Sequence, residues 1–378
     1  MTEHLQLNPF VPGDGQLPPH LAGRDAEQKA LRGLLAYLRA GRGAPGVAVL
    51  TGPRGNGKTA LMRWFQHEIE AGKPAIDVVW MTPGSIRDLD ALATELAPPG
   101  RFKGMSPDTL SVSIGVGRAG WKLGGGLRSL ARLLAARCRA QPLVLLLDEA
   151  HTLDQAVGQP LLNVSQEVRS EAPFLLALAG TPGLAAKLNS LSTTFWDRGE
   201  LIGVGRLAPA AAAEALTKPM AAQDPPISFT EAALGRVVES SQHYPYFLQL
   251  WGAALWNEAR DTGAELVDSA LMDRVQPAVE RRKTAYYQNR YGEINRKPLL
   301  PAARAVAEAF AGKSTLTENE FTRVIGDSQP ANTDPERLDA LDADLRALGY
   351  VWIPPGSTVL EAGIPSLMDF VREKALAG

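Results

Sequence analysis

One short segment constrains the fold more than any other part of the chain. Residues 52–59 read Gly-Pro-Arg-Gly-Asn-Gly-Lys-Thr, after the apolar run at 46–50 and before a helical pattern that continues to about residue 70. Glycines can turn their backbone N–H groups toward an anion because they carry no Cβ, and the positive end of the following helix adds attraction. A strand, a glycine-rich turn and a helix in this order predict a phosphate-binding loop.

The positions of this loop have separate expected tasks. Lys58 is expected to reach the β- and γ-phosphates of a nucleotide and to assist its hydrolysis, and the hydroxyl of Thr59 is expected to ligate Mg²⁺. The other nucleotide-binding positions predicted in this segment are Gly52, Pro53, Arg54, Gly55, Asn56, Gly57 and Ala60.

A second segment supplies two carboxylates. The run at 143–147 contains no polar residue, which predicts a strand buried on both faces of a parallel sheet. Asp148 and Glu149 follow it directly. We expect Asp148 to hold magnesium and Glu149 to polarise the attacking water, so that bound nucleotide is hydrolysed. The alternative is that the two acids only cap the next helix.

Apolar runs alternate with helical patterns through the first half of the chain, which predicts an α/β fold with a parallel sheet flanked by helices. Segment 98–125 interrupts this rhythm, and its alternation of polar and apolar residues predicts an inserted β-hairpin. The strands of the sheet are expected at 46–50, 76–81, 143–147, 174–179 and 201–204.

The same patterns divide the chain into four segments. Residues 1–22 are rich in proline and glycine and are expected to run extended. Residues 23–207 form the predicted phosphate-loop domain, and strand patterns stop after Ala208, so 208–297 are expected to form an all-α lid. Residues 298–378 suggest three helices and a β-hairpin, which is the pattern of a winged helix.

Two helix starts in the last segment have clear signals. Thr317 and Glu320 have the spacing of a capping box. Asp334 is placed as the N-cap of a helix whose first residue is Pro335.

From about residue 21 the chain resembles the AAA+ ATPases of the origin-recognition and STAND groups. The resemblance rests on the phosphate loop and the acid pair, together with Leu21-Ala22-Gly23-Arg24, Ala179-Gly180-Thr181-Pro182, Tyr244-Pro245-Tyr246 and the C-terminal winged helix. STAND lids usually carry Gly-x-Pro, and the glycine position here is His243.

The resemblance implies further site residues. Thr181 would contact the γ-phosphate, and Gly23, Arg24 and Pro245 would lie near the adenine. Arg198 would be an arginine finger that acts in a neighbouring subunit. A surface salt bridge is the alternative role for Arg198.

The resemblance also implies a function. ATP and Mg²⁺ would bind between the α/β domain and the lid, and slow or partner-stimulated hydrolysis would change the exposure of the winged helix, which contacts a protein partner or another copy of the chain. The alternative is a DNA-binding ATPase of the loader, partitioning or transposition type. The preference for ATP over GTP rests on the resemblance.

Charge gives mixed indications about DNA. The whole chain has a formal net charge of -2, so only local regions can attract phosphates. Residues 101–140 are rich in arginine and lysine, and 281–297 combine basic residues with tyrosines, which suits a nucleic-acid surface or an ordinary helix face. The predicted third helix of the winged helix, at 335–348, has an excess of acids that would repel DNA.

Other features carry little weight. The single cysteine, Cys138, excludes an intramolecular disulfide and a cysteine zinc site. No apolar run approaches the ~20 residues of a membrane span, and no signal peptide is visible, so a cytoplasmic protein is expected. The dinucleotide-like spacing at Gly115–Gly120 lies in the predicted hairpin, and Asp148-Glu149-Ala150-His151 spells a helicase box without further helicase motifs. We interpret both as incidental.

Overall fold

The computed structural model describes residues 7–97, 111–115, 118–122, 127–191, 199–296 and 298–376. The chain divides into two compact parts. The sheet part comprises Ala26–Thr51 and Met62–Gly203. The helical part comprises Met1–Asp25, Gly52–Leu61 and Val204–Gly378.

The sheet part is built on five parallel strands in the order β2-β5-β6-β1-β7, which confirms the predicted fold class. Every residue of the three central strands is buried, which explains their nearly continuous apolar sequences. The strands are β1 (Val47–Thr51), β2 (Asp77–Met81), β5 (Leu143–Leu147), β6 (Phe174–Gly180) and β7 (Gly199–Gly203).

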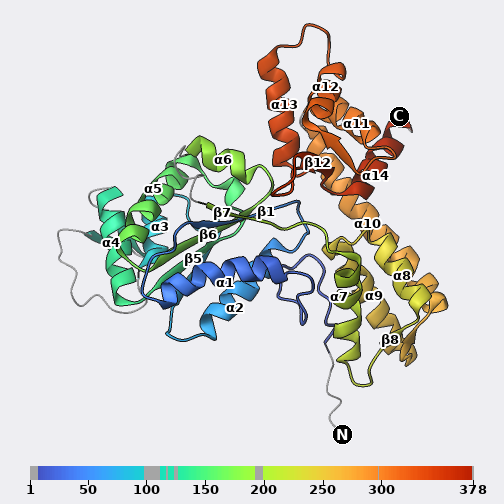
Figure 1. The fold of residues 1–378 in the computed structure, drawn as a ribbon, viewed down its shortest axis with the longest axis horizontal. Helices are drawn as coiled ribbons and strands as arrows, with labels where there is room; N and C mark the ends of the chain where they lie inside the picture. Colours follow the sequence, from blue (N-terminus) through green and yellow to red (C-terminus); the bar gives the residue numbers. More distant parts are fainter. Residues whose placement is uncertain are drawn as a thin grey trace. The chain divides into compact units, whose positions relative to one another are not determined.

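Helices cover the sheet, with α1 and α2 lying together beside it in Figure 1. The side chains at alternate positions of β5 pack with α3, α4, α5 and α6 in one apolar core, because successive residues of a strand point to opposite faces. The helices are α1 (Asp25–Arg39), α2 (Lys58–Glu70), α3 (Leu89–Leu96), α4 (Leu127–Ala140), α5 (Gln155–Glu171) and α6 (Leu184–Leu191). Helix α3 begins at Leu89, because Asp88 is its N-cap and accepts a hydrogen bond from the Ala91 amide.

The predicted insertion is an antiparallel hairpin of β3 (Ser111–Gly115) and β4 (Arg118–Lys122). Gly115 is therefore the last residue of β3, and the next element along the chain is the strand β4 and not a helix. A dinucleotide fingerprint requires a strand that leads into a helix, so the spacing at Gly115–Gly120 is incidental, as predicted. The remaining residues of 98–126 lie outside the described ranges.

The helical part has one continuous apolar core, whose largest fully buried side chains include Trp251, Phe247 and Phe321. It also contains β8 (Ser228–Phe229) and β9 (Leu266–Val267), a parallel pair that the sequence did not predict because two residues are too few to show alternation. Its helices are α7 (Pro209–Ala221), α8 (Glu231–Ser240), α9 (Pro245–Thr262), α10 (Ser269–Arg296), α11 (Leu300–Ala309), α12 (Glu318–Asp327), α13 (Pro335–Ala347) and α14 (Pro365–Leu376).

The C-terminal elements combine helices with a small antiparallel sheet of order β10-β12-β11. Its strands are β10 (Thr315–Thr317), β11 (Val351–Trp352) and β12 (Val359–Ala362). The capping box of Thr317 and Glu320 is formed, and Asp334 caps α13 ahead of Pro335, which confirms both predictions. Hydrogen bonds to the Glu320 carboxylate lower its pKa to about 2. The bond from the Thr317 backbone amide has the largest effect, and the bond from the Lys313 ammonium has the next largest. Within the described ranges, none of the helices has the length and apolar character needed to cross a bilayer.

Candidate nucleotide site

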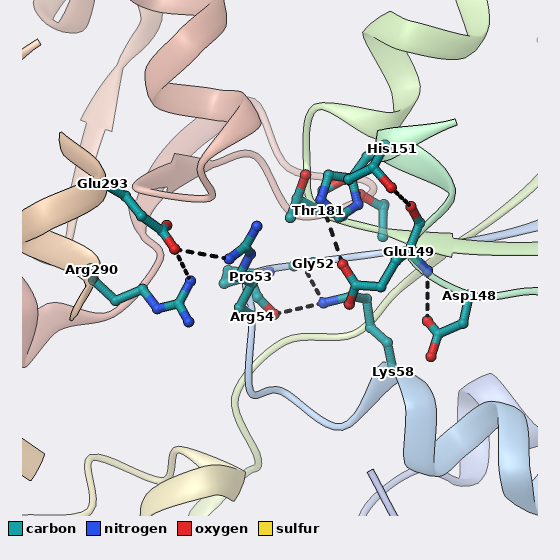
Figure 2. A network of polar contacts seen from close by, with 12 residues as sticks. Gly52, Pro53, Arg54, Lys58, Asp148, Glu149, His151, Thr181, Arg290 and Glu293 are labelled. Carbon is teal, nitrogen blue, oxygen red and sulfur yellow. Dashed lines mark hydrogen bonds and ion pairs between the residues drawn. The ribbon is translucent and has the colours of Figure 1, made fainter. Parts of the chain in front are cut away.

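The glycine-rich loop joins β1 to α2 and folds around its own lysine. The Nζ of Lys58 donates hydrogen bonds to the carbonyl oxygens of Gly52 and Pro53, each at 2.9 Å (Figure 2). Gly55 and Gly57 have φ angles of 80° and 89°, which only glycine adopts without strain. A Cβ on Gly52 would lie 2.2 Å from the carbonyl oxygen of Val204. Three of the loop's glycines are therefore required by its conformation.

Arg24 braces this loop from the segment before α1. Its guanidinium donates to the carbonyl oxygens of Asn56 at 2.9 Å and Gly205 at 2.6 Å, and the residue is only 5% exposed. Gly23 has a φ of 61°, and a Cβ there would lie 2.4 Å from the Ala211 side chain. Arg24 therefore holds the loop's backbone, while the adenine contact of Gly23 and Arg24 stays a prediction.

The start of α9 packs directly on the loop. The backbone N–H of Tyr246 donates to the Gly55 carbonyl oxygen at 3.2 Å, and a Cβ on Gly55 would lie 2.9 Å from the Tyr244 hydroxyl. Burial, and then the neighbouring hydroxyl of Tyr286, raise the pKa of Tyr244, which is fully enclosed. Pro245 is the first residue of α9 and sits between these two contacts. Its role beside the adenine stays a prediction.

His243 stands two residues before Pro245, at the position where STAND lids usually carry glycine. His243 has a φ of 59° and Gln242 a φ of 52°, so both lie in the left-handed region. This conformation costs a non-glycine residue roughly 1–2 kcal/mol. The backbone at His243 is thus the one that glycine favours. The Leu207 N–H donates a hydrogen bond to the His243 carbonyl oxygen at 3.0 Å, which holds the His243 backbone in this conformation.

A His243→Gly variant is expected to be at least as stable as the parent chain. Relief of the left-handed strain outweighs the extra flexibility of glycine in the unfolded chain, so the free energy of unfolding should rise by up to about 1 kcal/mol. Urea unfolding followed by circular dichroism measures this change. A loss of more than about 1 kcal/mol would show that the imidazole contributes packing that the strain argument omits.

The acid pair follows β5 without a helix in between. The Asp148 amide donates to the Met81 carbonyl oxygen at 3.1 Å, and the Glu149 amide donates to Oδ1 of Asp148 at 2.9 Å. Asp148 is 6% exposed. Glu149 has a φ of 54° and its side chain caps no helix, while Asp154 caps α5. The alternative that both acids are only helix caps is therefore wrong.

Thr181 follows the neighbouring strand β6. Residues Thr51 and Gly180 are register partners at the ends of β1 and β6, and Thr51 Oγ1 donates to the Thr181 carbonyl oxygen at 3.2 Å. Thr181 is 1% exposed, and its hydroxyl has no hydrogen-bond partner among the described residues. An unpaired buried hydroxyl costs roughly 1–3 kcal/mol. This position therefore suits a ligand oxygen such as that of a γ-phosphate.

The oxygen donors fit magnesium. Thr59 and Asp148 offer a hydroxyl and a carboxylate, and Mg²⁺ is commonly held by one or two protein oxygens together with substrate phosphates and water. In the part of the chain that the structure describes, no group of three or more His, Cys, Asp or Glu residues forms a metal cage. The role of Thr59 and Asp148 as Mg²⁺ ligands stays a prediction. Arg198 lies outside the described residues.

Several side chains of the two basic regions are engaged inside the protein. Arg137 is 9% exposed, donates to the Leu96 carbonyl oxygen at 2.6 Å and lies 3.5 Å from Asp77. Tyr286 stacks on Tyr246, and Tyr287 donates to the Ser366 hydroxyl at 2.8 Å. These three side chains therefore have partners within the protein, as the alternative of an ordinary helix face predicts for the two tyrosines.

Comparison with known proteins decides the family of this region. Residues 20–177 match the AAA ATPase domain. The chain carries an AAA ATPase domain. Hydrolysis of ATP is the activity of such a domain, in agreement with the predicted loop and acid pair. A search of curated protein sequences gave no match.

Solved structures resemble this chain over nearly its whole length. A Walker-type ATPase of Pyrococcus abyssi is 15% identical with a TM-score of 0.64, covering 97% of this chain and 99% of that one. The ORC2 protein of Aeropyrum pernix, in ADPNP–ADP complexes, is 16% identical with a TM-score of 0.60, covering 97% and 98%. The ORC1 protein of Aeropyrum pernix, in complex with DNA, is 14% identical with a TM-score of 0.50, covering 95% and 94%. At these identities the likeness shows the fold.

Proposed function

We propose that this AAA ATPase is a nucleotide-driven switch of the STAND type, in which the helical lid and a C-terminal winged helix report the state of the bound nucleotide to a protein partner. Lys58 and the loop amides grip the phosphates, Thr59 and Asp148 hold Mg²⁺, and Glu149 takes a proton from the attacking water. Thr181 contacts the γ-phosphate, so its contact is lost after hydrolysis.

One observation carries the proposal, namely the direct contact of the phosphate loop with α10. Arg54 in the loop lies 3.3 Å from Glu293, and Glu293 lies 2.8 Å from Arg290, in the last turns of this 28-residue helix (Figure 2). Helix α10 leads directly into the C-terminal elements. A change in the loop's conformation would therefore alter the end of α10.

Hydrogen exchange tests this coupling. Residues 285–296 of α10 should exchange at different rates in the ATP-bound Glu149→Gln variant and in the ADP-bound parent. Glu293→Gln should reduce that difference by at least half while ATP still binds. Asp273→Asn is the matched control, because Asp273 lies on the same helix and pairs with Arg236 at the surface. Equal exchange of α10 with ATP, with ADP and without nucleotide would refute the switch.

The alternative function, a DNA-dependent ATPase, has one supporting observation. Arg128 and Arg132 are exposed on one helix of the sheet part, α4, whereas Arg139 of the same helix lies 3.6 Å from Glu171. Helix α13 is poorly suited to enter a DNA groove. Arg346, one of its two basic residues, is paired with Asp342 and with Glu318 of α12. DNA binding, if present, would therefore use α4.

A gel shift and an ATPase assay with and without duplex DNA separate the two functions. A DNA-dependent enzyme would show stimulation that falls steeply as salt rises, because counterions are released from the phosphates. The proposed protein-coupled switch predicts no stimulation by DNA at about 150 mM salt, and stimulation that Arg128→Ala and Arg132→Ala abolish would favour the alternative.

A further inference from the structure

The histidine of the Asp-Glu-Ala-His segment lies between two of the predicted catalytic groups. The Thr181 backbone N–H donates to Nδ1 of His151 at 3.4 Å, and Nε2 of the same ring lies 3.6 Å from Oε2 of Glu149 (Figure 2). The His151 side chain is 11% exposed, whereas that of Glu149 is 51% exposed. A mostly buried ring therefore lies between the sensor position and a half-exposed carboxylate.

These contacts assign the protons on the ring. Because Nδ1 accepts the Thr181 N–H, the neutral imidazole carries its proton on Nε2, which faces Glu149. A separation of 3.6 Å is longer than a hydrogen bond, but catalytic contacts often tighten only when substrate is bound. The ring is thus oriented to donate to the carboxylate that is expected to act as the base.

Two backbone features bring the ring to this place. Glu149 takes a left-handed conformation, with φ 54° and ψ 29°, and opens a single 3-10 turn at Ala150–Thr152. On the other side of the ring, Gly180 provides space for His151. A Cβ on Gly180 would lie 3.3 Å from the His151 Cβ and 3.0 Å from the Leu184 side chain. Strained backbone of this kind tends to persist where function requires it.

We infer that His151 is a positioning residue for ATP hydrolysis, which links the γ-phosphate sensor Thr181 to the base Glu149. A shift of Thr181 toward the phosphate moves the ring by way of the N–H to Nδ1 contact, and the Nε2 proton then fixes the direction of the Glu149 carboxylate. The inference rests on the roles proposed for Glu149 and Thr181.

Three variants separate positioning from a structural role. His151→Leu keeps bulk but removes both polar contacts, and it is expected to lower kcat about 10- to 100-fold, as misplacement of a catalytic group does, with ATP affinity within about twofold. His151→Gln can still accept from the Thr181 N–H and donate to Glu149, so it should recover most of kcat. His67→Leu, at an exposed position of α2, is the control and should leave both constants unchanged.

An NMR measurement tests the geometry independently of turnover. In protein with ¹⁵N-labelled histidine, the neutral His151 ring, assigned by its loss in His151→Gln, should show a proton on Nε2 and none on Nδ1. An unchanged kcat in His151→Leu, equal losses in His151→Leu and His151→Gln, or a proton on Nδ1 would each overturn the inference. If the parent chain itself hydrolyses no ATP, the proposed function fails, while the ring's tautomer still tests the arrangement.

Discussion

A Glu149→Gln variant is expected to bind Mg·ATP as tightly as the parent and to hydrolyse it at least about 100-fold more slowly. A positioned general base contributes roughly 10²–10⁴-fold to a rate, and an amide cannot take the proton of the attacking water. The side chain is half-exposed and caps no helix, so the substitution removes little from the fold. Phosphate release in single-turnover assays measures the rate, and calorimetry measures the affinity.

A control variant isolates the charge effect. Glu167→Gln replaces an exposed glutamate on α5 and should change neither quantity. If Glu149→Gln turned over ATP at the parent rate, another group would have to be the base. If it lost affinity for ATP, its carboxylate would have a part in binding that our assignment does not include.

Replacement of Lys58 by alanine is expected to weaken ATP binding by at least about 100-fold, which corresponds to about 3 kcal/mol. The Lys58 ammonium lies within the loop and donates hydrogen bonds to the carbonyl oxygens of Gly52 and Pro53, each at 2.9 Å. Charge-assisted hydrogen bonds to phosphate are worth more than neutral ones. Fluorescence of a nucleotide analogue with Mg²⁺ present measures the affinity.

The same substitution leaves two carbonyl oxygens without this donor, so folding has to be checked. Thermal unfolding should show a modest loss of stability that leaves the chain folded at room temperature. Lys29→Ala is the matched control, because it removes an exposed lysine charge from α1 and should leave the affinity unchanged. An unfolded Lys58→Ala protein calls for Lys58→Met, which keeps the aliphatic stem. Parent-like affinity in either folded variant would contradict the loop's role.

The sequence predicted the parts of the fold whose signals are local. The buried strand at Leu143–Leu147 was visible because both of its faces are apolar, and the helix starts at Thr317 and Asp334 because their caps use neighbouring residues. The phosphate loop was visible because its glycines and lysine have fixed spacing. Such signals depend on a few residues next to each other in the chain.

Contacts between distant residues could not be predicted in this way. The brace from Arg24 to the carbonyl oxygens of Asn56 and Gly205 joins three separate segments. The approach of His151 to Thr181 depends on the adjacent ends of β5 and β6 and on the left-handed backbone at Glu149. A local interpretation treated that histidine as an incidental overlap with a helicase box, because nothing in its neighbours indicates the partner.

Calorimetric titration of the purified chain with ATP in the presence of Mg²⁺ tests the central claim most directly. A single saturable binding event is predicted, which is lost when Lys58 is replaced and kept when Glu149 becomes glutamine. Absence of any binding heat in the folded parent chain, at ATP concentrations up to several millimolar and at two temperatures, would contradict a nucleotide site at Gly52–Thr59.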